Sequence, residues 1–396
     1  MSAFKIKSPL PVEEGGTEVE LFTADTVVCG GTTTQGPLQN VADTGTINQA
    51  LTSQGAAALP EWGNISNVTF FELLSSDPGS PAVGQVWYNT TTNIFKGAID
   101  GTPASTWTSK TSMNTPKGYL AGSGATGGDT LSFGGATNDT TTIYATTELY
   151  AGAGNTWTAK NNMNTARLQL GGSGTSADAL SCGGGNPTEI KTTERWNATN
   201  WTAKTAMNTA QTTLGTSDED ANDTLAFGGL VSPSTALNAC ERYDGTGNTW
   251  ANKATLLTKK RNVAGSDSAA TAFEFGGAAG SVNPLYATSS RYDGSANSWV
   301  SRASMNTGRR SLAGAGSSLS ALSFGGFGGG TTTEEYNNTA NAWLARSSMN
   351  TSRNSLGGSG IVSDALSFGG NAPSTSAVTE RYQGNPGPTV VTFDVT

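Results

Sequence analysis

A tryptophan recurs six times across most of the chain, and the same kind of residue follows each copy. The tryptophans are Trp107, Trp157, Trp201, Trp250, Trp299 and Trp343, at spacings of 50, 44, 49, 49 and 44 residues. An apolar residue follows six positions later in every copy, at Met113, Met163, Met207, Leu256, Met305 and Met349. A period near 47 residues is typical of propeller blades and solenoid repeats, in which one unit cannot bury its hydrophobic face alone.

The segments around each tryptophan have the two-residue alternation of β-strands. Leu131 and Phe133 stand two apart just before a Gly-Gly pair, so both point to one face of a strand. The second of these positions recurs as Phe227, Phe275, Phe324 and Phe368, with Cys182 in the remaining copy. A segment such as 241–243 then precedes a turn rich in Asp, Gly and Asn, which tolerate left-handed backbone. We expect four short strands per repeat and no helix.

The order Gly-Gly, Tyr-Asp, Trp and Met-x-x-x-Arg resembles the kelch repeat, and the resemblance covers residues 94–382. It implies a β-propeller built from four-stranded blades. The sequence departs from the family pattern at three points. Asn-Thr follows the Met where the family often has Pro, Cys182 replaces an aromatic residue, and Gln211 replaces a base.

The two ends of the repeat region carry complementary parts of one further repeat. Trp107 has no Gly-Gly segment before it, and the segment that ends at Tyr382 has no tryptophan after it. Pairing these halves would close a ring and remove the exposed sheet edges of an open array. We therefore expect an all-β fold, a six-bladed kelch-type β-propeller with a small β-rich N-terminal attachment region. The expected core contains Trp107, Trp157, Trp201, Trp250, Trp299, Trp343, Phe133, Phe227, Phe275, Phe324 and Phe368.

The N-terminal region differs in character from the repeats. Residues 51–63 and 79–93 resemble short modules of bacteriophage tail fibres and related virion appendages. Val86-Trp87-Tyr88 and Ile94-Phe95 flank a polar turn and predict a hairpin. Short strands are also expected within 17–22 and 26–29.

The chain therefore divides into three expected parts. Residues 1–93 form a strand-rich virion-attachment region, residues 94–382 form the propeller, and residues 383–396 contain a C-terminal strand. A strand at a chain end is suited to adding to the sheet edge of a partner protein.

The composition excludes several classes of function. The chain has no His, 13% charged residues and a formal net charge of −8. The absence of His rules out Ser-His-Asp and Cys-His catalysis and imidazole metal sites, and the acidic balance argues against nucleic-acid binding. Three scattered cysteines imply no disulfide framework. No stretch approaches the ~18 apolar residues of a membrane span. We expect no enzyme activity, no catalytic or metal-binding residue and no cofactor.

A basic residue follows the tryptophan by ten positions in five of the six repeats, at Lys117, Arg167, Lys260, Arg309 and Arg353. One interpretation is a ring that binds an anionic glycan or a phosphate at one end of the propeller. Because the position belongs to the repeat itself, the favoured interpretation is hydrogen bonding to loop carbonyls of the adjacent blade. A second charged feature, Asp218-Glu219-Asp220, lacks the alternating oxygen spacing of a calcium loop, so we expect a solvated loop there.

Two functions from different classes remain. The first is a non-enzymatic structural or appendage protein of a tailed-phage virion, attached to other virion proteins through residues 1–93 and contacting host surface glycans. Residues 1–9 lack the apolar core of a signal peptide, which favours assembly in the host cytoplasm and exposure, in multiple copies, on the particle surface. The alternative is a secreted or cell-surface bacterial adhesin or carbohydrate-binding protein of the kelch type, with a glycan-degrading enzyme third. Ligand contacts are expected where the repeats differ, in the loops 135–147, 229–240 and 277–289.

Overall fold

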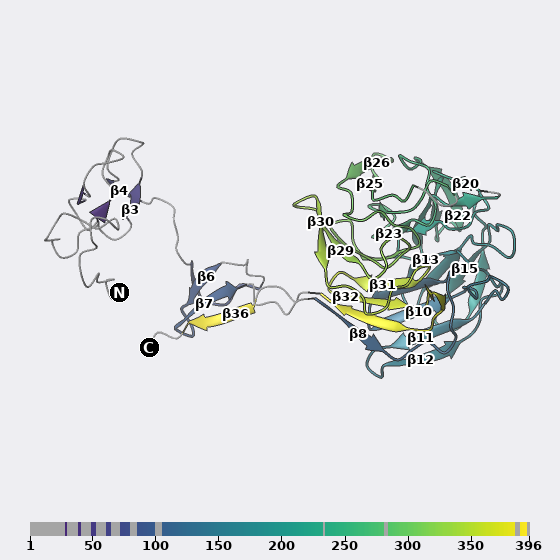
Figure 1. The fold of residues 1–396 in the computed structure, drawn as a ribbon, viewed down its shortest axis with the longest axis horizontal. Helices are drawn as coiled ribbons and strands as arrows, with labels where there is room; N and C mark the ends of the chain where they lie inside the picture. The colour runs from purple at the N-terminus through teal and green to yellow at the C-terminus, as the bar shows by residue number, and fades with distance from the viewer. Residues whose placement is uncertain are drawn as a thin grey trace. The chain divides into compact units, whose positions relative to one another are not determined.

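The structure is a computed structural model. It describes residues 72–79, 85–97, 105–232, 234–280 and 284–384 in full, together with the backbone of short strands outside these ranges. The chain divides into two compact units, one of Met1–Ile99 with Val390–Thr396 and one of Asp100–Thr389 (Figure 1). The described residues form strands and turns without a helix, so the predicted all-β class is confirmed.

The larger unit contains six antiparallel four-stranded sheets, numbered 1 to 6 along the chain. Sheet 1 consists of β9 (Ala121–Thr126), β10 (Asp129–Phe133), β11 (Thr147–Ala151) and β12 (Thr156–Lys160). Sheet 2 consists of β13 (Gly171–Gly174), β14 (Ala179–Cys182), β15 (Thr193–Trp196) and β16 (Trp201–Lys204). Sheet 3 consists of β17 (Gly215–Thr216), β18 (Asp223–Phe227), β21 (Cys240–Asp244) and β22 (Thr249–Lys253).

The remaining sheets follow the same pattern. Sheet 4 consists of β23 (Ala264–Ser266), β24 (Phe273–Phe275), β25 (Ser289–Asp293) and β26 (Ser298–Arg302). Sheet 5 consists of β27 (Ala313–Gly316), β28 (Ser320–Phe324), β29 (Thr333–Asn337) and β30 (Ala342–Arg346). Sheet 6 consists of β31 (Gly357–Ile361), β32 (Asp364–Phe368), β35 (Thr379–Gln383) and β8 (Thr106–Lys110). Two small hairpins extend the loops, β19 (Leu230–Val231) with β20 (Thr235–Ala236) and β33 (Asn371–Ala372) with β34 (Ser374–Thr375).

Sheet 6 joins the two ends of the repeat region, as their complementary halves predict. Its outer strand β8 comes from the start of the unit and pairs antiparallel with β35, with Trp107 opposite Tyr382. The first strands of the sheets also contact one another in a closed cycle, in the order β9, β13, β17, β23, β27, β31 and back to β9. Small four-stranded sheets in this arrangement are consistent with a β-propeller.

The glycine-rich sequence of the first strands follows from their close contact. A Cβ on Gly265 would lie 2.3 Å from the carbonyl oxygen of Thr216, and one on Gly314 would lie 3.0 Å from the carbonyl oxygen of Gly265. Sheet 3 has Thr216 at this position instead, and its Oγ1 donates a hydrogen bond to the carbonyl of Gly172 at 2.6 Å. Where glycine stands at this position, neighbouring first strands approach too closely for a Cβ, and Thr216 fits only with its hydroxyl bonded to the neighbouring strand.

Each repeat tryptophan lies on the outer strand of one sheet, and most pack against the second strand of the preceding sheet. Trp157 of sheet 1 lies 5.4 Å from Phe368 of sheet 6, measured between ring centroids. The same contact joins Trp107 to Phe324, Trp201 to Phe133, Trp299 to Phe227 and Trp343 to Phe275. All eleven expected core aromatics are at most 8% exposed. The core therefore consists of layers between neighbouring sheets, which hold the sheets to one another.

Cys182 stands in sheet 2 where the other repeats have phenylalanine. Its side chain is 1% exposed, carries a free thiol and belongs to the same buried cluster as Trp250 of sheet 3. Burial raises the pKa of the Cys182 thiol to about 12, so the thiol stays protonated near neutral pH. The residue acts as a small apolar packing group between sheets 2 and 3.

The smaller unit contains a further four-stranded sheet, in the order β36 (Thr389–Phe393), β7 (Ile94–Ile99), β6 (Val86–Asn89) and β5 (Glu72–Leu74). The antiparallel pairing of β6 with β7 confirms the predicted hairpin. The C-terminal strand expected within 383–396 is present as β36, although it does not remain available to a partner protein. Instead, β36 pairs with β7 of its own chain.

Four short strands precede this sheet. They are β1 (Val28–Cys29), β2 (Gln39–Asn40), β3 (Gln49–Thr52) and β4 (Glu61–Asn64). β1 pairs with β2 and β3 pairs with β4, both antiparallel. Part of the strand expected within 26–29 is thus present as β1, whereas the strand expected within 17–22 lies outside the described residues.

Asp77 stabilises the sheet of the smaller unit through three side-chain contacts. Its carboxylate accepts hydrogen bonds from Trp87 Nε1 at 3.1 Å and Asn89 Nδ2 at 2.8 Å, and it pairs with Lys96 Nζ at 2.6 Å. The contacts with Lys96, Asn89 and Trp87 lower the pKa of Asp77 to about 2. This carboxylate links the loop after β5 to both strands of the hairpin.

Candidate functional site at the central axis

The basic residues of the repeat are buried rather than displayed. Each residue is at most 1% exposed, at Lys117, Arg167, Lys260, Arg309 and Arg353. Four of them form ion pairs with a buried glutamate, in the pairs Arg167–Glu194, Lys260–Glu274, Arg309–Glu334 and Arg353–Glu380. The charges of these four bases are therefore compensated inside the unit, whereas Lys117 Nζ donates to the carbonyl and hydroxyl oxygens of Thr146, both at 3.2 Å.

Arg353 shows how this position works. Its Nη1 donates to the carbonyls of Gly369 and Val378, both at 2.8 Å, and its Nη2 donates to Glu380 at 3.0 Å. Hydrogen bonding to loop carbonyls is what the favoured interpretation predicted. However, the carbonyls belong to the sheet that the base precedes, sheet 6, and not to the adjacent sheet. Each base thus holds the incoming chain segment onto its own sheet.

Glutamate also binds this incoming segment. Glu380 accepts hydrogen bonds from the backbone N–H groups of Asn350 and Thr351, at 2.6 and 3.2 Å. Sheet 3 retains the equivalent Glu241, which accepts from the backbone of Asn208 and Thr209. There, Gln211 replaces the base, and its fully buried amide has no hydrogen-bond partner among the described residues.

A closed ring of backbone hydrogen bonds surrounds one end of the first strands. Each repeat contributes one residue to the ring, two positions after the base or after Gln211. Its N–H donates to the carbonyl of the equivalent residue in the previous repeat, over distances of 2.7–3.0 Å. These six residues, which we call the axial ring, are Tyr119, Gln169, Thr213, Asn262, Ser311 and Ser355. All six have positive φ, between 52° and 58°. The ring positions the side chains on either side of it around a common axis.

A positively charged cavity opens beside the axial ring. This cavity of about 180 Å³, which we call the arginine mouth, is lined by Arg261, Arg310 and Phe327 together with polar residues that include Asn262 and Asn354. Arg310 Cζ lies 4.6 Å from the centroid of the Phe327 ring. Burial and the nearby charge of Arg310 lower the pKa of Arg261. Among the described residues, the lining contains two cations and no carboxylate.

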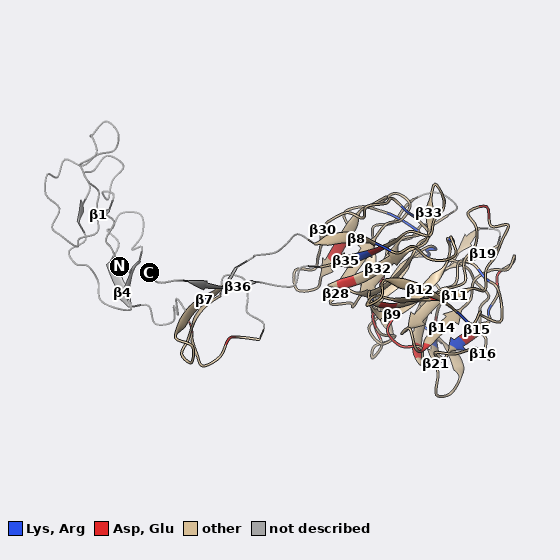
Figure 2. Cartoon of the chain, turned by 90° about the horizontal axis from the view of Figure 1, so that it is seen from below, with Lys and Arg blue, Asp and Glu red and all other residues tan. Residues whose placement is uncertain are grey.

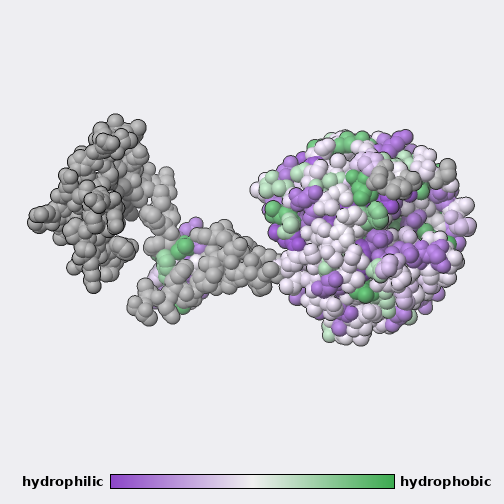
Figure 3. All heavy atoms as spheres, viewed as in Figure 1, coloured by the Kyte–Doolittle hydropathy of each residue, from purple (hydrophilic) through white to green (hydrophobic). Residues whose placement is uncertain are grey.

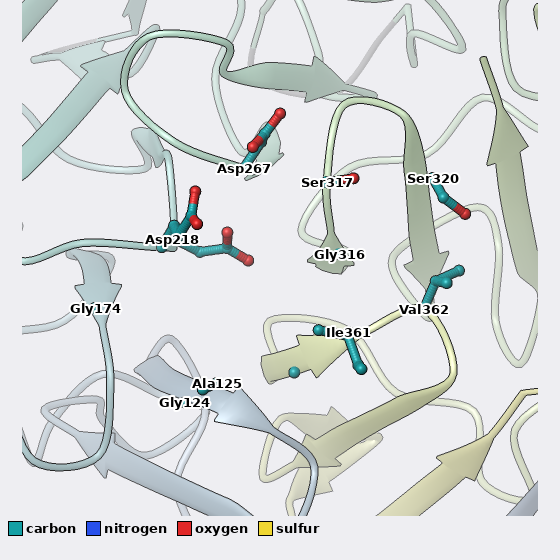
Figure 4. Close-up of a pocket in the computed structure, with 12 residues that line it drawn as sticks. Gly124, Ala125, Gly174, Asp218, Asp267, Gly316, Ser317, Ser320, Ile361 and Val362 are labelled. Carbon is teal, nitrogen blue, oxygen red and sulfur yellow. The ribbon is translucent and has the colours of Figure 1, made fainter. Parts of the chain in front are cut away.

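A second cavity, of about 320 Å³, lies at the other ends of the first strands. We call this cavity the acidic mouth. Asp218 and Asp267 lie on one side of it and Ile361 and Val362 on another (Figure 4). Burial raises the pKa of Asp218, and the charge of Asp267 adds to the shift. Asp218 was expected in a solvated loop but is half-buried in this cavity, whereas its neighbour Glu219 is exposed.

The backbone and carboxylate of Asp267 have structural roles at the acidic mouth. Its Oδ1 accepts a hydrogen bond from the N–H of Ser268 at 2.7 Å, and its Oδ2 accepts from the N–H of Ser318 at 2.8 Å. The N–H of Asp218 donates to the carbonyl of Asp267 at 3.0 Å, and Asp267 in turn donates to Gly316. These bonds join sheets 3, 4 and 5. In the part of the chain that the structure describes, no group of three or more Asp, Glu and Cys residues is placed to hold a metal ion.

Charged residues elsewhere are few and scattered over the ribbon (Figure 2). The face drawn in Figure 3 has only small hydrophobic patches. Exposed large apolar side chains nevertheless occur, at Leu73, Leu257, Val300, Leu319, Phe327, Leu344 and Ile361. Of these, Phe327 lines the arginine mouth and Ile361 the acidic mouth.

Sequence reasoning missed the two arginines of the mouth, although the sequence contains a signal for them. Both directly follow a repeat base, in Lys260-Arg261 and Arg309-Arg310. The other repeats have Gly118, Leu168, Thr212 and Asn354 at this position. The second base is thus an addition to the repeat and not part of it, which distinguishes it from the buried base before it.

Within the described residues, no helix has the length and apolar character needed to cross a membrane. Comparison of the sequence with models of protein families and with curated proteins gives no match.

Proposed function

We propose that this chain is a non-enzymatic structural protein of a tailed-phage virion that displays a six-bladed kelch-type β-propeller and contacts host surface glycans. The observation that carries the proposal is the double connection between the two units. The chain leaves the smaller unit after β7 and returns to it as β36, and these two strands are neighbours in one sheet. A double connection suits a module that is held on a support and exposed.

The closed order of sheets supports the six-bladed propeller. The first strands contact one another in a cycle of six, and the axial ring closes with six backbone hydrogen bonds. Sheet 6 contains strands from both ends of the unit, which is how ring proteins remove exposed edges.

The hydrogen bonds and ion pairs of the buried charged groups support a non-enzymatic function. The repeat bases are engaged with glutamates or carbonyls, and the Asp267 carboxylate is held by two backbone N–H groups. A glycosidase requires two carboxyl groups that flank a substrate bond at a defined separation. We infer that the acidic mouth maintains the packing of sheets 3 to 5.

The test is localisation of the chain on particles. Antibodies against residues 105–384 should label purified phage particles in electron micrographs, at a regular position, and mass spectrometry should find several copies per particle. Detection of the chain only at the surface of uninfected bacteria would contradict the proposal and favour a bacterial adhesin. Turnover of a host polysaccharide by the purified chain would contradict the non-enzymatic function.

A further inference from the structure

We propose that the arginine mouth binds the anionic group of an acidic sugar, with Arg261 and Arg310 as the residues that recognise it. This inference rests on the proposed contact with host glycans and names the site and the chemical class of the ligand. Both arginines line one cavity of about 180 Å³, and the described residues of its lining include no carboxylate. Two guanidinium groups in one cavity repel each other, and a bound anion relieves this repulsion.

The positions of both arginines are set by the backbone. Arg261 forms an antiparallel bridge with Ala278, and Arg310 forms one with Phe327. In addition, the Nε of Arg261 donates to the carbonyl of Gly280 at 2.7 Å. The Arg310 guanidinium lies over the Phe327 ring. The site is therefore formed before a ligand arrives, which reduces the entropy lost on binding.

The rest of the lining favours a sugar over a simple anion. Gln169, Asn262 and Asn354 contribute amides that can both donate and accept hydrogen bonds. Ser311 and Ser355 contribute hydroxyl groups of the same dual character, and Phe327 is 49% exposed. Amides and hydroxyls match the hydroxyl groups of a sugar ring, and an exposed aromatic face suits its C–H surface. The charged pair would fix the orientation of the acidic group.

The site also lies where the repeats differ. Arg261 contacts Gly280, which belongs to the loop 277–289, one of the loops in which ligand contacts were expected. The equivalent residues of sheets 1, 2, 3 and 6 are not basic, so the charge lies on one side of the axis. A binding site confined to sheets 4 and 5 can vary without altering the repeat that forms the fold.

Titration calorimetry on the full chain tests the proposal with three probes. They are an oligosaccharide that ends in a uronic acid, the same oligosaccharide with its carboxylate reduced to an alcohol, and sodium sulfate. We expect the acidic oligosaccharide to bind, and the reduced one to bind about tenfold more weakly or worse, because hydrogen bonds to a charged group are lost. Sulfate should bind more weakly than the acidic oligosaccharide, since it makes no contact through a sugar ring.

Variants assign the binding to the mouth. Arg261→Gln and Arg310→Gln should each weaken the acidic oligosaccharide about tenfold. Arg310→Lys should retain part of the affinity because it keeps the charge. Lys204→Gln removes an equal charge from the outer strand β16 and should bind like the unaltered chain. Thermal unfolding of each variant checks that it is folded.

Three results would overturn the proposal. The first is unaltered affinity in both glutamine variants, and the second is binding of the reduced oligosaccharide as tightly as the acidic one. The third is affinity for the acidic oligosaccharide no greater than for sulfate, which would indicate an adventitious anion. None of these results bears on whether the chain is part of the virion. Antibody labelling of virions therefore tests the proposed function separately.

Discussion

Arg353 and Glu380 form an ion pair at 3.0 Å in which both side chains are completely shielded from solvent. The pair joins the segment that enters sheet 6 to the third strand of that sheet. Because a buried ion pair loses the hydration of both charges, its value lies in fixing one arrangement more than in net stability. Equivalent pairs with the third strand occur in sheets 2 and 5, whereas in sheet 4 Lys260 pairs with Glu274 of the second strand.

Restoring the base in sheet 3 should stabilise the larger unit. Gln211→Arg would place a guanidinium beside the buried Glu241 and replace an amide that has no partner among the described residues. We expect the free energy of unfolding to rise by about 1.5–3 kcal/mol, the value of a hydrogen bond to a charged group. Urea unfolding of the full chain measures the change.

The opposite substitution serves as the control. Arg353→Gln leaves Glu380 buried without its cation and should lower stability by about 3–5 kcal/mol. A loss of stability in Gln211→Arg would mean that the cavity around Glu241 has closed and cannot accept the longer side chain.

Lys117 should make stability increase with pH in alkaline solution. Burial lowers the pKa of Lys117 to about 8, against a value of 10.5 for a solvated lysine. Between these values the unfolded chain binds the proton and the folded chain does not, so the folded state gains stability as pH rises. The gain reaches about 3 kcal/mol at most.

Unfolding curves at pH 7 and pH 10.5 detect this gain when the unaltered chain is compared with Lys117→Met. The variant lacks the titrating group, and the difference between the two chains cancels the contribution of the tyrosines. Equal pH dependence in both chains would show that Lys117 keeps its proton in the folded state.

The backbone strain of the axial ring should be measurable at Thr213. This β-branched residue has φ of 57°, and its buried hydroxyl has no partner among the described residues. Thr213→Gly should raise stability by about 1 kcal/mol, because glycine adopts positive φ without a Cβ clash. Calorimetry gives the change in melting temperature. Thr213→Val removes the hydroxyl but keeps the strain, so an equal gain in both variants would assign the effect to the hydroxyl.

Trp107 should be as important for stability as the tryptophans within continuous repeats. It packs against Phe324 at 5.1 Å and Tyr382 at 5.2 Å, and its Nε1 donates to Thr333 at 3.0 Å. Trp107→Ala should lower the stability of the larger unit by about 3–5 kcal/mol. Trp157→Ala in sheet 1 is the matched comparison. A much smaller cost at Trp107 in calorimetry would indicate that the unit does not depend on closure through β8.

Asp77 should stabilise the sheet of the smaller unit only above acidic pH. Its pKa is about 2 in the folded chain and 3.8 when solvated, so its contribution is complete above 3.8 and disappears as pH falls towards 2. Asp77→Asn should accelerate hydrogen exchange in residues 86–97 at pH 7, while residues 105–384 exchange as before. Near pH 2 the variant and the unaltered chain should exchange alike. Equal exchange at pH 7 would show that the contacts with Lys96, Asn89 and Trp87 contribute little.

The repeat made the sheets predictable, because residues such as Trp157 and Phe368 occupy positions that only a regular array of strands explains. The meeting of Trp107 with Tyr382 was predictable for the same reason. Pairing of the base with glutamate was not, since Arg353 and Glu380 are separated by 26 intervening residues and either could have faced solvent. The arginine mouth was not predictable, because Arg310 directly follows the repeat base Arg309. Alternation along the chain does not say which of these two arginines is buried.

The pairing of β8 with β35 has a mechanical consequence. The register places Thr106 opposite Gln383, so the chain enters and leaves the larger unit at the same end of two adjacent strands. A pull transmitted through both connecting segments therefore acts on the same end of both strands and divides the force between them. Sliding either strand out of sheet 6 breaks several backbone hydrogen bonds at once, whereas a single terminal strand peeled from its end would release them one at a time. The larger unit is therefore attached through two chain segments, and cleavage of one segment leaves the other still connected.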